Sequence, residues 1–111
     1  MLYEYYPKDR RALINDIISL LDRGIKDLNC IDVSRITDFS MVFAGFRNNN
    51  RALLVDYDLE GIDISKWDVS RGENFSAMFA SSKNFNCDIS GWNVSSGENF
   101  NLMFSDCTKF N

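Results

Sequence analysis

The 111-residue sequence contains no histidine, one proline and three cysteines. Without histidine the chain lacks the commonest zinc ligand and the usual imidazole base. The cysteines (Cys30, Cys87 and Cys107) are odd in number and have no CxxC spacing, so we expect reduced thiols that form neither a disulfide framework nor a metal site. We therefore predict no cofactor, no metal ion and no enzymatic activity.

The sequence also has few of the features that direct a chain to a membrane or to nucleic acid. No apolar run approaches the roughly 20 residues that span a bilayer, and the first residues do not resemble a signal peptide. We expect a cytoplasmic protein with no membrane insertion, or a surface-exposed one if the chain is a fragment of an exported protein. The net charge of -4 argues against a general basic surface, so we expect nucleic acid to be contacted only indirectly.

Hydrophobic and aromatic residues are plentiful. They make up 45% and 14% of the chain, and nine of the aromatic residues are phenylalanine. This composition is typical of a chain that buries a core, so we predict a single folded domain over residues 1–111.

An internal repeat dominates the sequence. The string Asp-Ile-Ser-x-Trp-x-Val-Ser-x-Gly-Glu-Asn-Phe begins at Asp63 and again at Asp88, which gives a period of 25 residues. A weaker copy begins near Asp27, at an offset of 36, so about eleven residues are inserted between the first two copies. A period of this length predicts a solenoid, in which each unit buries its apolar face only when a neighbour stacks on it.

Stacking at the repeat offsets places equivalent apolar residues above one another at roughly the 4.8 Å strand spacing. We interpret these columns as core packing, including the tryptophans. The predicted columns are Leu28, Ile64 and Ile89; Ile31, Trp67 and Trp92; Val33, Val69 and Val94; Phe39, Phe75 and Phe100; and Phe43, Phe79 and Phe104.

Each copy contains two local patterns. The Ile-Ser-x-Trp-x-Val run alternates apolar and polar residues, which predicts a short strand, and Asn-Phe-x-x-Met-Phe has the spacing of a helical turn. Before the repeats, Pro7 suits a helix start, apolar residues follow at helical spacing over 13–21, and Gly24 suits the helix end. We therefore predict the α/β class: a small leucine-rich-repeat-like solenoid of about three coils with parallel strands over 25–111, capped by an N-terminal helix within 1–24.

The doubled motif "DIS.W.VS....F..MF.....FN" resembles the repeat of BspA-like bacterial surface proteins, a divergent leucine-rich-repeat family. The resemblance covers roughly residues 25–111, although Gly72-Glu73-Asn74-Phe75 replaces the Val-Thr-Asp-Met that family repeats usually carry. It implies a repeat fold and a habit of binding proteins, and it implies no catalytic residues.

Two regions stand out as candidates for binding. The insertion at about 44–62 contains a polar turn and then a partly alternating run. We selected Arg47, Arg51 and Tyr57 there because arginine and tyrosine are enriched at interfaces, and Lys66 and Arg71 as exposed repeat positions. The chain also ends flush with its third copy, which has no lid. Truncation from a longer array, homodimerisation and occlusion by a partner all explain this open end, and we favour the last two.

The repeat also aligns polar residues. Asp27, Asp63 and Asp88 form one column, and Asp32, Asp68 and Asn93 form another. Stacked carboxylates bind Ca²⁺ in some repeat proteins, but a single Asp per coil also caps a turn, and we favour capping because no calcium-type nonapeptide is present.

The predicted function is a non-enzymatic protein–protein interaction module of leucine-rich-repeat type that binds through its solenoid surface. The alternative is a small inhibitor, encoded by a phage or mobile element, that blocks a host defence protein or ribonucleoprotein. Small size and acidic charge favour the alternative, whereas the family resemblance favours the interaction module.

Overall fold

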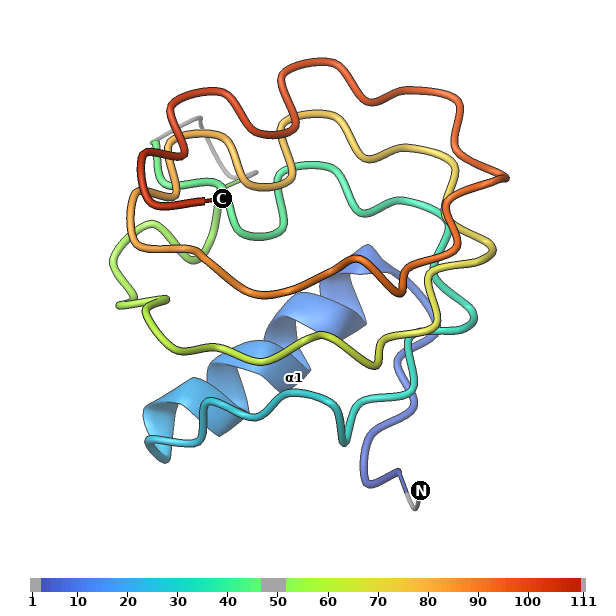
Figure 1. Cartoon of the computed structure of the whole chain (residues 1–111). Coiled ribbons are helices and arrows are strands. Elements are labelled where there is room, and N and C mark those ends of the chain that lie inside the picture. The colour runs from blue at the N-terminus through green and yellow to red at the C-terminus, as the bar shows by residue number, and fades with distance from the viewer. Residues whose placement is uncertain (1–2, 47–51, 111) are drawn as a thin grey trace.

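The computed structural model describes residues 3–46 and 52–110 (Figure 1). Within these ranges it contains one helix, α1 (Arg10–Asp22), and isolated parallel β-bridges in place of extended strands. The bridges join Tyr5 to Ile31, Asp27 to Asp63, Asp38 to Asn74, and Asn74 to Asn99.

Helix α1 forms where its termini are capped and one side is apolar. The side chain of Asp9 accepts a hydrogen bond from the backbone N of Ala12 at 2.9 Å, so the helix begins after the N-cap at Asp9 and later than the predicted start at Pro7. Leu13, Ile14, Ile17 and Leu20 are buried in the main hydrophobic core. Gly24 follows the helix with a φ of 76°, a left-handed conformation that glycine adopts without a steric penalty.

The three repeat copies lie one above another as turns of the chain that we call the first layer (27–46), the second layer (63–86) and the third layer (88–110) (Figure 1). The Phe39 and Phe75 rings stack with centroids 5.4 Å apart, and the Phe75 and Phe100 rings with centroids 5.3 Å apart. A second ring column contains Phe43, Phe79 and Phe104 at 5.6 and 5.5 Å. These contacts confirm the two phenylalanine columns that were predicted from the repeat offsets.

Along the phenylalanine columns (39–45, 75–81 and 99–105), backbone hydrogen bonds between the layers run in one direction. Just before these columns the direction is reversed, as Glu73 N donates to Thr37 O and Glu98 N to Glu73 O. Alternate N–H groups of each layer donate to carbonyl oxygens of the next layer, as Phe39 N does to Asn74 O at 2.8 Å and Phe75 N to Asn99 O at 2.7 Å. The intervening N–H groups are used within the layer, as when Met78 N donates to Phe75 O. The second layer donates in this way from Phe75, Ala77, Phe79 and Ser81 to the oxygens of Asn99, Asn101, Met103 and Ser105.

The predicted α/β class, with parallel strands and short helical pieces in each of about three coils, is wrong. Asx turns interrupt the expected strands: in the second layer the side chains of Asp63, Asp68 and Asn74 each accept a hydrogen bond from the backbone N two residues later. The expected helical turn is interrupted by a left-handed residue, Ala77 at φ 51°, whose equivalents Met41 and Leu102 are also left-handed. Each layer is therefore a succession of turns in place of a strand and a helix.

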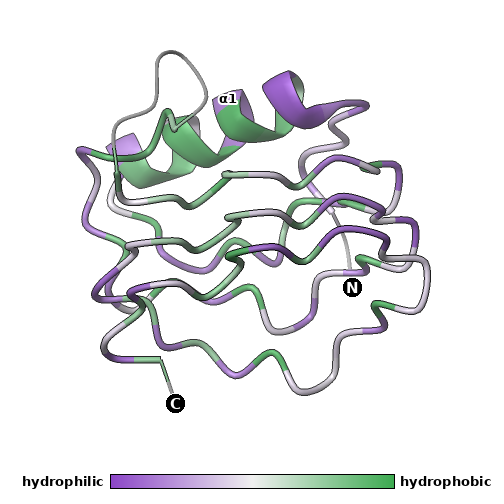
Figure 2. Cartoon of the chain, turned by 90° about the horizontal axis from the view of Figure 1, so that it is seen from above, coloured by the Kyte–Doolittle hydropathy of each residue, from purple (hydrophilic) through white to green (hydrophobic). Residues whose placement is uncertain are grey.

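The first layer is covered on the side that faces away from the second layer. Tyr5 pairs with Ile31 on the outward side of the first layer, and the side chain of Arg10 donates to Ser40 O at 2.7 Å. The N-terminal segment and α1 therefore cover the first layer. Figure 2 shows α1 along one edge of the stacked turns of the chain.

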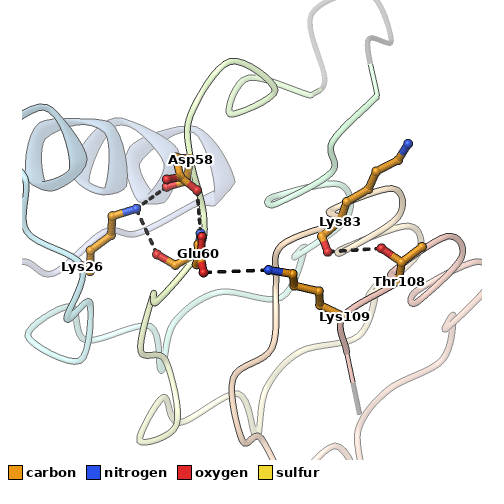
Figure 3. A network of polar contacts seen from close by, with 6 residues as sticks. All are labelled: Lys26, Asp58, Glu60, Lys83, Thr108 and Lys109. Carbon is orange, nitrogen blue, oxygen red and sulfur yellow. Dashed lines mark hydrogen bonds and ion pairs between the residues drawn. The ribbon is translucent and has the colours of Figure 1, made fainter.

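The described part of the insertion, 52–62, packs back on the molecule. Lys26 Nζ donates to the backbone oxygens of Asp58 and Glu60, and the Glu60 carboxylate faces Lys109 Nζ of the third layer at 3.9 Å (Figure 3). The Tyr57 hydroxyl donates to Asp22 at the end of α1 at 2.9 Å. These contacts hold the insertion against both α1 and the side of the layers.

Candidate interaction surface

Apolar side chains of the third layer are exposed on the side that faces away from the second layer. Three exposed side chains, two half-buried ones and the buried Met103 line a shallow, almost wholly apolar groove of about 210 Å³, which we call the third-layer face. Its residues are Ile89, Trp92, Val94, Phe100, Met103 and Phe104.

The repeat provides an internal measure of this exposure, because equivalent residues occur in covered layers. Phe39 and Phe75 are completely buried, whereas Phe100 is 42% exposed. The second column behaves likewise, since Phe79 is completely buried and Phe104 is 38% exposed. The third-layer face therefore carries the residues of a core column that no layer of the described chain covers. Soluble proteins rarely expose contiguous apolar surface without a use for it.

The backbone of the third layer carries a matching polar feature, a row of N–H groups without a hydrogen-bond acceptor in the described part of the chain. Their equivalents in the second layer donate to the third layer, whereas no residue of 3–46 or 52–110 provides an acceptor to these groups of the third layer. Carbonyl groups along the same segment are used internally, as when Phe100 O accepts from Met103 N at 3.2 Å. We call this row the donor edge; it consists of the N–H groups of Phe100, Leu102, Phe104 and Asp106.

The aspartate columns are used for capping. The carboxylates of Asp63 and Asp88 each accept a hydrogen bond from the backbone N of the serine two residues later, at 3.0 and 2.9 Å. These bonds favour the ionised form and lower the pKa of both carboxyl groups below the usual value. The geometry confirms the turn-capping interpretation of this column. Among residues 3–46 and 52–110, no group of three or more Cys, Asp or Glu side chains is placed to hold a metal ion.

The cysteines have thiol environments that suppress ionisation. Burial is the main cause that raises the pKa of Cys87 and of Cys107, and the carboxylate of Asp63 adds to the effect at Cys87. The Cys107 thiol donates to the backbone oxygen of Phe79 at 2.6 Å, so it acts as a polar contact between two layers. Neither environment favours the thiolate that a nucleophile requires.

The contact residues selected from the sequence are not gathered at the third-layer face. Lys66 and Arg71 are exposed on the second layer, and Tyr57 is half-buried with its hydroxyl bonded to Asp22. The Asp22 carboxylate accepts that bond and raises the pKa of the tyrosine hydroxyl. Arg47 and Arg51 lie outside the described residues. The open end was recognised from the sequence, but the face residues themselves were assigned only to core columns.

A family model described as "Mycoplasma protein of unknown function, DUF285" matches residues 15–111. No curated protein and no solved structure matches the chain. Separately, α1 is too short to cross a membrane, and it is the one helix found in the described ranges.

Proposed function

Because this chain belongs to the DUF285 family, whose description assigns no function, we propose its function from its architecture. We propose that the chain is a non-enzymatic protein–protein interaction module that binds a partner protein through the third-layer face. The observation that carries the proposal is the exposure of Phe100 and Phe104, whose equivalents in the covered layers are fully buried.

The composition of the third-layer face supports binding over chemistry. Its groove is apolar, and it contains aromatic residues, which dominate the energetics of protein interfaces. Each ring is already stacked on one side, so Phe100 and Phe104 are held in position before a partner arrives. A preorganised aromatic surface loses little side-chain entropy on binding.

We further propose that the repeat is of the BspA-like type found in bacterial surface proteins. The string Asp-Ile-Ser-x-Trp-x-Val-Ser followed by Phe-x-x-Met-Phe carries this resemblance in the second and third copies. It supports a binding function, because that family is associated with protein recognition and carries no catalytic motif that matches this sequence.

The test is capture of partner proteins by the immobilised chain from a cell lysate, followed by mass spectrometry. A Phe100→Ser/Phe104→Ser variant should lose the specific partners, because it removes both exposed rings of the groove. The matched control is Lys66→Ser/Arg71→Ser, which changes two exposed residues elsewhere and should retain them. Equal capture by the wild type and the Phe variant would contradict binding at this face.

A further inference from the structure

We propose that the partner of the third-layer face is a second polypeptide that contributes a repeat of this same 25-residue type, docked in parallel as a fourth layer. This inference rests on the proposed function and names the chemistry of the partner: an apolar, aromatic segment with an uncovered row of backbone carbonyl groups. The donor edge, the spacing of the rings and the covered state of the first layer carry the inference.

The donor edge determines which backbone groups the partner must present. Between the second and third layers, four alternate N–H groups meet four alternate carbonyl oxygens at 2.7 to 3.0 Å, and the same arrangement joins the first layer to the second. The donor edge of the third layer repeats the N–H half of this arrangement. A partner that covers it must present carbonyl oxygens at alternate residues, because a buried N–H group without an acceptor is unfavourable by roughly 1–3 kcal/mol.

The rings determine the spacing of the partner's apolar residues. Phe100 and Phe104 continue two columns in which successive centroids lie 5.3 to 5.6 Å apart, and Trp92 continues a third column at 6.5 Å from Trp67. A segment with phenylalanines four residues apart places its rings on both columns while its carbonyls face the donor edge. The repeat itself has this combination, in Phe75 and Phe79 and again in Phe100 and Phe104.

A second copy of this chain does not supply the required surface. If two third-layer faces meet, donor edge faces donor edge, and the N–H groups of both copies remain unpaired. Head-to-tail stacking requires the outward side of the first layer, where Tyr5 pairs with Ile31 and Arg10 donates to Ser40 O. A second copy of these residues is therefore excluded as the occupant, and the partner that we propose carries a repeat without such a cover.

Most of the donor edge lacks the charged residues and prolines that normally keep an exposed edge from pairing. From Asn99 to Ser105 there is no charged residue and no proline, and Asp106, at the end of the donor edge, is its one charged residue. Natural edges are commonly protected by lysine, proline or inward-pointing charges. An unprotected edge next to exposed rings is typical of a surface that adds a further segment of chain.

The experiment uses amide hydrogen exchange followed by NMR on the full chain, with a synthetic peptide of the sequence of residues 87–111 as the probe. The peptide should slow exchange at Phe100, Leu102, Phe104 and Asp106 by at least about tenfold at saturation, since each amide gains an acceptor. The amides of Phe75, Ala77, Phe79 and Ser81 already have acceptors and serve as internal controls. A scrambled peptide of the same composition should protect none of the four.

A second variant tests the inference if the free peptide is too disordered in solution to bind. One more copy of residues 87–111 is appended after Asn111, which raises its effective concentration at the face to the millimolar range. The four donor-edge amides should then be protected without added peptide. Absence of protection in this tethered chain overturns the inference, and so does peptide binding that leaves the four amides exposed.

The outcomes separate this inference from the proposed function. Capture that depends on Phe100 and Phe104, together with an unprotected tethered chain, leaves the binding function standing and overturns the repeat partner. Self-association of the wild-type chain in light scattering that Phe100→Ser/Phe104→Ser abolishes would identify a second copy as the occupant, which also overturns it. Equal capture by the wild type and the Phe100→Ser/Phe104→Ser variant, together with protected amides in the tethered chain, would instead overturn only the proposed function.

Discussion

The second and third layers are close copies of one sequence in different surroundings. Phe75 and Phe79 lie between two layers, whereas Phe100 and Phe104 have a neighbouring layer on one side only. The same residue types with the same stacking geometry are therefore core in one layer and accessible surface in the other. The difference shows that, in a repeat protein, the role of a residue depends on which copy it belongs to as well as on its identity.

The largest difference between the layers should appear on truncation of a ring. Phe79→Ala leaves a cavity in a fully buried site and should lower the free energy of unfolding by about 3–5 kcal/mol. Phe104→Ala removes a ring that is partly in water and should cost about 1 kcal/mol. Urea denaturation of both variants measures the two effects. Equal losses would show that the third layer is covered in solution.

A smaller difference is expected for the indole hydrogen bonds. Trp67 Nε1 donates to Leu28 O at 2.9 Å in a buried site, and Trp92 Nε1 donates to Ile64 O at 3.1 Å in a partly buried one. Trp67→Phe should cost roughly 1–3 kcal/mol because Leu28 O loses its partner away from water. Trp92→Phe should cost less, because water reaches the vacated site. Circular dichroism in urea gives both values, and a larger loss at Trp92 would contradict the burial difference.

The smallest difference concerns acid stability. Asp63 accepts hydrogen bonds from both the backbone N and the hydroxyl of Ser65, and its pKa is lowered. A carboxyl group with a lowered pKa stabilises the fold above its unfolded value, roughly pH 4, and this contribution is lost as the pH falls through the folded pKa. Asp63→Asn should therefore make the urea midpoint less dependent on pH between about 5 and 2.

The comparison for this prediction is Asp88→Asn in the third layer. Asp88 is exposed and makes the same backbone contact with Ser90, so its substitution should flatten the profile less than Asp63→Asn does. Midpoints measured at several pH values for the wild type and both variants decide the order. A profile that Asp63→Asn leaves unchanged would show that the capping bonds do not couple to folding.

The sequence predicted what the repeat period controls and missed what single residues do to the backbone. The offsets of 36 and 25 placed Phe39 over Phe75 and Phe75 over Phe100, because stacking follows from equivalence along the chain. The prediction of strands and helical turns was wrong. Left-handed positions such as Ala77 are not glycine, so the sequence does not mark them as turns. Spacing alone made the apolar residues after Asn74 resemble a helical turn, whereas the ladder to the third layer fixes them in successive turns.

The binding residues illustrate the same limit. Tyr57 was selected by residue type, yet its hydroxyl is committed to Asp22, a contact that depends on how the insertion folds back. The sequence predicted that the third copy has no lid, but it did not predict whether the third-layer face presents hydrogen-bond donors or acceptors. Only the hydrogen bonds along the phenylalanine columns show that Phe100, Leu102, Phe104 and Asp106 present donors, and no pattern in the sequence encodes their direction.

The repeated hydrogen bonds along the phenylalanine columns also affect how such a protein can change its length. Along the phenylalanine columns, both junctions between layers use equivalent donors, equivalent acceptors and the same ring stacking. A 25-residue copy inserted between Asn86 and Cys87 would therefore meet equivalent groups on both sides of these columns. Addition of whole copies would therefore keep α1 packed against the first layer and would keep the same residue types in the third-layer face. In evolution, the number of stacked copies and the residues exposed on the third-layer face can therefore change independently of each other.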